Sequence, residues 1–172
     1  MQKKRSHLHE FLDTVFVFVV VCALYVVFRY FIRFPIVNGQ SMEPTYHNGD
    51  KLAVLYTKNV NRNDIVVSWS EELNEYIVKR VIGIPGDKIE IQDGILYRNG
   101  FRVYESYLND SDWHTDHSVT VLLKDDEFFL LGDNRNNSMD SREFGAISRD
   151  DIFGKVLKNM QQEKGSDNEE MD

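Results

Sequence analysis

The chain has 172 residues, which is enough for one folded domain and an additional segment. Its formal net charge of −8 argues against the basic surface typical of nucleic-acid-binding proteins, so we expect no nucleic-acid partner. Cys22 is the only cysteine, so no intrachain disulfide can form and the fold must depend on its hydrophobic core.

The first predicted element is an apolar segment near the N-terminus. Residues 14–28 carry no charge, and residues 11–34 together supply the ~20 residues that a membrane-spanning helix needs. A buried core helix is disfavoured because apolar residues occupy every face. A cleaved signal peptide is disfavoured because no pair of small residues at cleavage spacing follows the apolar stretch. We therefore expect residues 11–34 to form an uncleaved transmembrane helix and interfacial segment in a phospholipid membrane.

The charges that flank this segment predict its orientation. Basic residues occupy positions 3–5 before the span, and Arg29 and Arg33 lie at its far end. The positive-inside rule favours a cytoplasmic N-terminus over residues 1–10. The domain that follows would then lie on the extracellular side of the cell membrane. No second apolar run is long enough to span, so we expect a single-pass protein.

Beyond the apolar segment, short β-type runs alternate with turn signals. This pattern predicts a mainly β protein, with an antiparallel β-sheet or barrel-like domain over residues 35–160. Asp93-Gly94 and Asn99-Gly100 are typical of two-residue hairpin turns. Residues 161–172 carry five acidic side chains against one lysine, which is typical of a disordered acidic tail. The predicted strands are 51–56, 64–69, 76–84, 88–92, 95–98, 101–104, 119–123 and 127–131.

Residues 109–118 form a polar stretch that holds several potential metal ligands, namely Asp112, His114, Asp116 and His117. Zinc sites usually take three or four protein ligands that rigid elements hold in place. A stretch of this composition is more typical of a solvated loop. We therefore expect no metal and no other cofactor.

The segment that begins at Asn38 contains a candidate nucleophile. Gly39 permits a sharp bend in the backbone, and Ser41 follows two residues later. A serine hydroxyl is a weak nucleophile at neutral pH and needs a neighbouring base to take its proton. A lone Gly-x-Ser is more often an ordinary turn, so this interpretation depends on finding a base elsewhere in the chain.

Lys79 is the candidate base. On a strand it shares one face with Ile77, and burial on an apolar face would lower its pKa because burial disfavours the charged form. A neutral amine can act as general base to a serine. The alternative places Lys79 in solvent and Arg80 in the interior, and the spacing does not choose between the two. Asp133 could pair with Arg80 and so hold this strand.

Residues 131–145 combine two glycines, three asparagines and opposed charges directly after an apolar strand. They could form a polar loop held by local turns. As part of a site, Asp140 and Arg142 could brace one another, and Ser138 could orient a nearby amine. Such bracing would fix the geometry that proximity catalysis requires.

Together, these features resemble the signature blocks of bacterial type I signal peptidases, in their short, single-span Gram-positive form. The order and spacing of the blocks also match, and the resemblance extends from the apolar segment to about Val156. Any one block alone would be weak, whereas four in order are specific. The blocks are Ser41-Met42-x-Pro44-Thr45, residues 63–67, residues 79–87 and residues 132–142.

The resemblance implies a membrane-bound serine endopeptidase that removes N-terminal signal peptides from secretory preproteins after small-x-small sites. It implies a Ser41–Lys79 dyad in which Ser41 is the nucleophile and Lys79 the general base. Ser138 would hydrogen-bond Lys79, and Asp140 and Arg142 would form a structural ion pair. The residues expected at the shallow substrate pockets and the oxyanion hole are Val37, Gly39, Met42, Ile77 and Val78.

Gly39 departs from those family members in which a serine two residues before the nucleophile helps to build the oxyanion hole. The backbone N–H of Ser41 remains as a donor. Losing one oxyanion donor costs about 2.7–4 kcal/mol where that donor is essential. Short, single-span Gram-positive members also carry glycine at this position, so we expect an active enzyme of that subtype.

Three alternatives to a signal peptidase are less well supported by the sequence. A penicillin-binding type of Ser–Lys hydrolase needs a lysine three residues after a serine, and no serine in this chain has one. Self-cleaving repressor-type Ser–Lys proteases share the dyad chemistry but have no need of a membrane span. A membrane-tethered β module that binds exported segments without cleaving them is the third, and a Ser41→Ala comparison separates it from an enzyme.

Overall fold

The computed structural model describes residues 7–108 and 118–159, and every structural statement below concerns these residues. The expected acidic tail over residues 161–172 lies outside them, as does most of the polar stretch considered for a metal site. Most of the expected cytoplasmic segment also falls outside this range.

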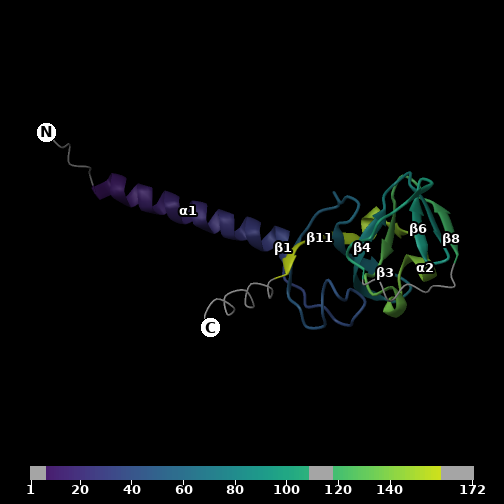
Figure 1. Cartoon of the computed structure of the whole chain (residues 1–172). Helices are drawn as coiled ribbons and strands as arrows, with labels where there is room; N and C mark the ends of the chain where they lie inside the picture. Colours follow the sequence, from purple (N-terminus) through teal and green to yellow (C-terminus); the bar gives the residue numbers. More distant parts are fainter. Residues whose placement is uncertain (1–6, 109–117, 160–172) are drawn as a thin grey trace.

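The chain begins with a long apolar helix, α1 (His7–Phe31), which projects away from the β domain (Figure 1). Residues Glu10–Phe31 of this helix are long and apolar enough to cross a membrane, and within the described residues no other helix is. Large apolar side chains along it, such as Phe16 and Phe18, are more than half exposed. A lipid bilayer would cover this apolar surface, and a helix satisfies its own backbone hydrogen bonds there. The helix therefore fits the predicted membrane anchor.

Seven strands form one antiparallel sheet with an open edge at each end, rather than a closed barrel. Its central strands β3 and β4 pair residue by residue from Ile65↔Arg80 to Ser70↔Glu75. In spatial order the strands are β1 (Ile32–Arg33), β2 (Leu52–Leu55), β11 (Ile152–Asn159), β3 (Ile65–Ser70), β4 (Glu75–Gly83), β9 (Glu127–Leu131) and β10 (Ile147–Ser148).

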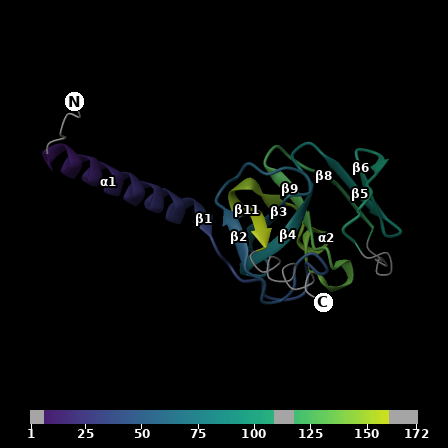
Figure 2. The same cartoon turned by 60° about the vertical axis from the view of Figure 1, so that its left-hand side comes forward.

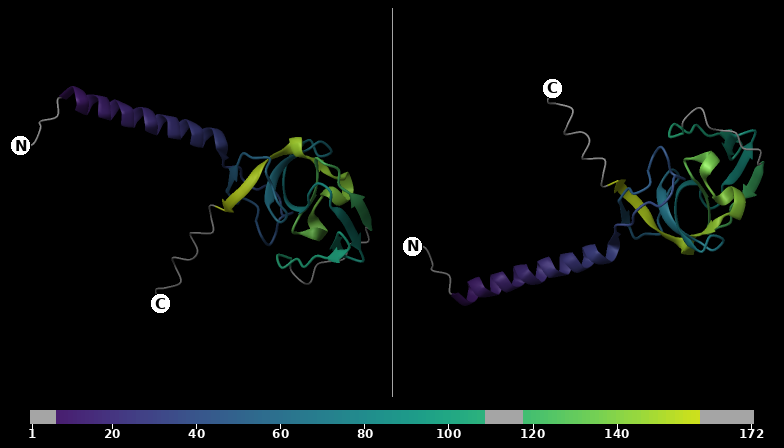
Figure 3. Two further views of the ribbon diagram at one scale, coloured as in Figure 1. Left: turned by 90° about the horizontal axis from the view of Figure 1, so that it is seen from above. Right: turned by 90° about the horizontal axis from the view of Figure 1, so that it is seen from below.

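A second antiparallel sheet of four strands lies at the end of the domain away from α1 (Figure 2). Views from above and below show α1 leaving the opposite end of the domain (Figure 3). The strands, in spatial order, are β7 (Phe101–Arg102), β6 (Ile95–Arg98), β5 (Lys88–Gln92) and β8 (Val119–Leu122). Three short helical turns complete the described elements: η1 (Arg135–Asn137), α2 (Ser141–Phe144) and η2 (Arg149–Asp151).

Buried apolar side chains tie these elements together in three clusters. One joins the two sheets, with Ile89 and Leu96 of the small sheet packed with Phe129 of the large one. Another holds the segment after β1 against the large sheet, because Val37 and Met42 are buried with residues of β2, β3 and β11. Ser41, the candidate nucleophile, lies between Val37 and Met42 in the chain. The third cluster packs side chains of β3, β4, β9, β10 and the start of β11 together.

All eight predicted strands are present, with bounds that shift by a few residues at some ends. The two predicted hairpin turns are confirmed, since Asp93, Gly94, Asn99 and Gly100 all have positive φ. The sequence-based prediction omitted β10 and β11, and it also omitted β1, whose two residues it placed in the transmembrane and interfacial segment over residues 11–34. In β11 the apolar pattern is interrupted by Gly154, where a Cβ atom would lie 2.4 Å from the carbonyl oxygen of Leu55. The close approach of β2 thus requires glycine at this position, and the same glycine interrupts the apolar pattern by which a strand is predicted.

Candidate active site

The segment that carries Ser41 is held on both sides by hydrogen bonds and burial. After β1, Val37 exchanges hydrogen bonds with the turn opposite, donating to Asp50 O at 2.8 Å and accepting from Gly49 N at 2.9 Å. Gly39 then adopts a φ of 95°, which a side chain would disfavour, and turns the chain towards Ser41. Met42 is 1% exposed and fixes the far side of the turn.

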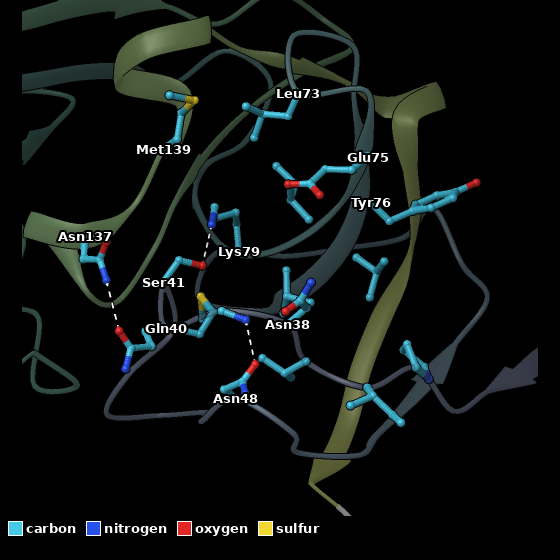
Figure 4. Close-up of a pocket in the computed structure, with 18 residues that line it drawn as sticks. Asn38, Gln40, Ser41, Asn48, Leu73, Glu75, Tyr76, Lys79, Asn137 and Met139 are labelled. Atoms are coloured by element: carbon cyan, nitrogen blue, oxygen red, sulfur yellow. Dashed lines mark hydrogen bonds between the residues drawn. The ribbon is translucent and has the colours of Figure 1, made fainter.

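Lys79 reaches Ser41 from the middle of β4. Its side chain is buried, with 4% of the residue exposed, and Nζ donates a hydrogen bond to Ser41 Oγ at 2.6 Å (Figure 4). Burial lowers the pKa of Lys79 to about 8, while the negative charge of Asp140 opposes this shift. The amine is therefore neutral in a much larger share of molecules at mildly alkaline pH than an exposed lysine would be.

The structure buries both Lys79 and Arg80, so neither of the two alternatives drawn from strand spacing was complete. Adjacent strand residues face opposite sides, but the second half of β4 is covered on both. Arg80 donates from Nε to Asp133 Oδ1 at 2.8 Å and from Nη2 to Oδ2 at 2.5 Å. Its guanidinium also lies 3.9 Å from the ring centroid of Tyr107. The expected pairing of Asp133 with Arg80 is present.

Asp140 organises the loop between β9 and α2. Its carboxylate accepts hydrogen bonds from Arg142 Nε at 2.8 Å, from the hydroxyl of Ser138 at 2.8 Å and from the backbone of Gly132 at 2.9 Å. It also caps α2 in a reciprocal arrangement with Glu143. The expected ion pair with Arg142 is present, and both side chains are buried.

Ser138 departs from its expected contact. The resemblance implied a hydrogen bond to Lys79, whereas the hydroxyl of Ser138 donates to Asp140 Oδ2, and no bond to Lys79 is present in the described structure. A carboxylate two residues away on the same loop is a strong, charged acceptor and takes the only proton of the hydroxyl. Lys79 uses Ser41 as its hydrogen-bond partner instead.

Gly132 and Asn134 belong to the fourth sequence block but were given no role in the site, although both touch the nucleophile segment. A Cβ atom on Gly132 would lie 2.2 Å from Ser138 Oγ and 2.5 Å from the carbonyl oxygen of Ser41. Only glycine therefore lets this loop approach the serine. The backbone N–H of Asn134 donates to that same carbonyl at 3.0 Å. A glycine directly after an apolar strand was the one signal in the sequence that pointed to such a contact.

An open pocket of about 710 Å³ lies beside the Ser41–Lys79 pair (Figure 4). It runs between the segment around residues 35–42 and the outer half of β4. Side chains that the sequence analysis did not name, among them Leu73 and Met139, also line it. The five residues expected at substrate pockets and the oxyanion hole all line it: Val37, Gly39, Met42, Ile77 and Val78.

Two further observations bear on the chemistry. Within residues 7–108 and 118–159, no group of three or more His, Cys, Asp or Glu side chains is arranged to hold a metal ion. The backbone N–H of Ser41 has no acceptor in the described part of the chain, whereas its carbonyl is hydrogen-bonded. An N–H in this state, on the residue that carries the hydroxyl, can donate to an oxyanion that forms on an attacked carbonyl group.

The family model described as "Signal peptidase, peptidase S26" matches residues 10–160. The chain belongs to this family. It is 38% identical over 167 residues to signal peptidase I P of Bacillus subtilis subsp. natto, with 89% of each protein covered. It is 35% identical over 153 residues to signal peptidase IB of Staphylococcus aureus strain Mu50, covering 77% of this chain and 80% of that protein.

A solved structure agrees with this membership. A signal peptidase I from Enterococcus faecalis V583 matches with a TM-score of 0.51 and 30% sequence identity, over 58% of this chain and 97% of that one. The family that the four sequence blocks resembled and the mainly antiparallel β fold are thus confirmed. Among known peptidase chemistries, a serine hydroxyl in contact with a buried lysine amine is suited to attack on a carbonyl carbon.

Proposed function

We propose that this protein is a membrane-anchored signal peptidase I that removes signal peptides from secretory preproteins. Ser41 is the nucleophile and Lys79 the general base. The observation that carries this proposal is the 2.6 Å contact between Lys79 Nζ and Ser41 Oγ, beside an open pocket and with the amine buried. Membership of the signal peptidase family supports the substrate class.

The reaction begins when the neutral amine of Lys79 takes the proton of the Ser41 hydroxyl as Oγ attacks the scissile carbonyl carbon. The N–H of Ser41 donates to the oxygen that becomes negatively charged. The tetrahedral intermediate collapses to an acyl-enzyme ester, and the Lys79 ammonium gives its proton to the departing amine of the mature protein. Lys79 then takes a proton from water, and the resulting hydroxide attacks the ester. Collapse of the second intermediate releases the signal peptide and returns the proton to Ser41 Oγ.

The other residues of the site support the dyad. Asp140 and Arg142 hold the loop beneath Ser41, Ser138 is part of that loop, and the Arg80–Asp133 pair fixes β4 next to Lys79. Apolar side chains at Val37, Met42, Ile77 and Val78 leave shallow space beside the dyad, which favours small residues on either side of the skipped position in a small-x-small site.

The membrane geometry fits the same function. With the N-terminus in the cytoplasm, residues 1–10 remain inside and α1 spans the bilayer within residues 11–34. The peptidase domain over residues 35–160 then lies on the extracellular side, next to the membrane, followed by an acidic tail over residues 161–172. In a signal peptide the cleavage site follows the apolar segment, so a signal peptide that enters the bilayer with its basic end inside presents that site on the side where the domain lies.

The proposal is tested by incubating the full-length protein in detergent with a synthetic precursor peptide that contains an Ala-x-Ala site. Wild type should cut directly after the second alanine, and Ser41→Ala should have no measurable turnover while keeping the same thermal unfolding midpoint. Product masses identify the cut site. Turnover by Ser41→Ala would remove Ser41 as the nucleophile, and peptide binding without cleavage by wild type would favour the non-catalytic binding module.

A further inference from the structure

The side chain of Asn134 makes a contact that its position does not lead one to expect. Asn134 is the N-cap residue of η1, where asparagine commonly accepts a hydrogen bond from the backbone two or three residues on. No such cap bond is present. Instead the amide Nδ2 donates to the carbonyl oxygen of Gln40 at 3.1 Å, across 94 positions of sequence. The side chain thus contacts the nucleophile turn rather than its own helical turn.

Asn134 holds two consecutive carbonyls of that turn. Its backbone N–H donates to Ser41 O at 3.0 Å, while its side chain donates to Gln40 O. A third donor, the backbone N–H of Glu43, reaches Gln40 O at 3.2 Å. The oxygen of the peptide unit that joins Gln40 to Ser41 is therefore held by two donors, one from Glu43 nearby in the chain and one from Asn134.

A fixed carbonyl also fixes the N–H of the same peptide. The peptide unit is planar and trans, so the N–H of Ser41 points away from the side on which Gln40 O meets Asn134. Asn134 does not line the pocket, whereas Ser41 does. This N–H has no acceptor in the described residues, which leaves it available to a negatively charged oxygen formed beside Ser41 Oγ.

We propose that Asn134 is a positioning residue for the oxyanion hole, acting through the carbonyl of Gln40 to aim the N–H of Ser41. This proposal rests on the proposed peptidase function of the same site. It also bears on Gly39, which supplies no side-chain donor: the N–H of Gly39 donates to Asn48 Oδ1 at 2.9 Å and is occupied. The N–H of Ser41 then carries more of the stabilisation, and its orientation matters correspondingly more.

The test compares Asn134→Ala with wild type on the Ala-x-Ala precursor peptide. The kcat should fall by about 10- to 100-fold, because the donor is misaligned rather than removed, and KM should stay the same. Affinity for the same peptide ending in an aldehyde, which forms a tetrahedral adduct with a serine hydroxyl, should fall by a similar factor. The apparent pKa in the pH–rate profile should not move, because Lys79 is unchanged.

Two further variants keep the test decisive. Asn134→Asp has the same shape but places a carboxylate oxygen against Gln40 O, so its loss in kcat should be at least as large as that of the alanine variant. Asn59→Ala makes the same type of change at an exposed asparagine that does not line the pocket and should keep wild-type kcat.

The outcomes separate the two proposals. Wild-type kcat and aldehyde affinity in both Asn134 variants would overturn the positioning role. A loss of kcat accompanied by an equal rise in KM and a lower unfolding midpoint would show that Asn134 is merely structural, and would overturn it as well. Failure of the peptidase proposal is seen separately, as absence of turnover in wild type or as retained turnover in Ser41→Ala.

Discussion

Lys79 and Arg80 are neighbours on β4 with side chains on opposite faces, and their surroundings shift the two pKa values in opposite directions. On one face, Arg80 is joined to Asp133 by two hydrogen bonds and donates a third to Asn63 O. On the other, Lys79 has a neutral hydroxyl as its hydrogen-bond partner. Burial acts to lower the pKa of both residues, but at Arg80 the hydrogen bonds and charge of Asp133 outweigh it, and the pKa of Arg80 is raised. The pKa of Lys79 is lowered to about 8.

This difference separates a supporting residue from a proposed catalytic one. A buried cation with an opposed carboxylate stays charged and stabilises the contact between β4 and the loop after β9. A buried amine whose neighbouring carboxylates only partly offset its desolvation gives up its proton more easily. The same strand thus provides a rigid support on one side and a poised base on the other.

The largest expected effect comes from changing the base itself. Lys79→Arg keeps a long, positively charged side chain, but a guanidinium does not give up its proton at working pH. Cleavage of the precursor peptide should fall by about 10²–10⁴-fold or more, the range associated with general acid–base catalysis. Initial rates at pH 8–9, where wild type has its neutral amine, provide the measurement.

Lys88→Arg is the matched control for that change, since Lys88 is an exposed strand lysine that pairs with Glu90. It should keep wild-type activity. Substantial activity in Lys79→Arg would contradict the general-base role, because that variant cannot accept the proton of Ser41.

Removing the carboxylate on the opposite face should damage the fold. Asp133→Ala leaves the buried guanidinium of Arg80 without its partner, and breaking a buried pair in this way costs about 3–5 kcal/mol of unfolding free energy. Denaturant unfolding of the detergent-solubilised protein, followed by tryptophan fluorescence, measures the change. Glu90→Ala breaks the exposed ion pair with Lys88 and should change the stability little. Equal, small effects of both changes would show that the two ion pairs do not differ.

Lys79→Met is expected to change the unfolding free energy less than Asp133→Ala does, and to raise it rather than lower it. The folded-state pKa of about 8 lies below the ordinary value of 10.5, so the unfolded chain binds this proton more readily than the folded one. The stability of wild type should therefore rise with pH between about 8 and 10.5, and below that window the buried ammonium destabilises the fold.

Methionine has no proton to lose, so at pH 6–7 Lys79→Met should be inactive yet more stable than wild type by about 1–3 kcal/mol. Above the window the two proteins should approach one another. Unfolding free energies of both proteins across this pH range provide the comparison. Parallel curves would mean that Lys79 is not desolvated in the folded protein.

The sequence was sufficient to find the groups that meet in the site, because each carries a local signal. A glycine precedes Ser41, apolar residues surround Lys79, and hairpin dipeptides mark the strands between them. The sequence did not reveal that both faces of β4 are buried. Strand spacing assigns only one face of a strand to the core, whereas residues from elsewhere in the chain, among them the loop from Gly132 to Arg142, also cover β4. That cover depends on contacts distant in sequence.

The same limit applies to contacts within the loop. Family resemblance directed Ser138 towards Lys79, but the acceptor two residues away, Asp140, is closer in space and charged. The reach of Asn134 to Gln40 could not be predicted either, since asparagine at that position is explained by helix capping alone. β11 was likewise not predicted, because Gly154 interrupts its apolar pattern and is required only by the close approach of the neighbouring strand β2.

The ionisation of the Lys79 amine tests the central claim most directly. Titration of the full-length protein in detergent with ¹³C-labelled lysine, using Lys79→Met to assign the resonance, follows the Cε shift of Lys79 as a function of pH. A midpoint near 8, matched by the lower limb of the kcat/KM profile for precursor cleavage, is the predicted result. A midpoint near 10.5, with cleavage rates that stay flat through pH 8, would contradict the account.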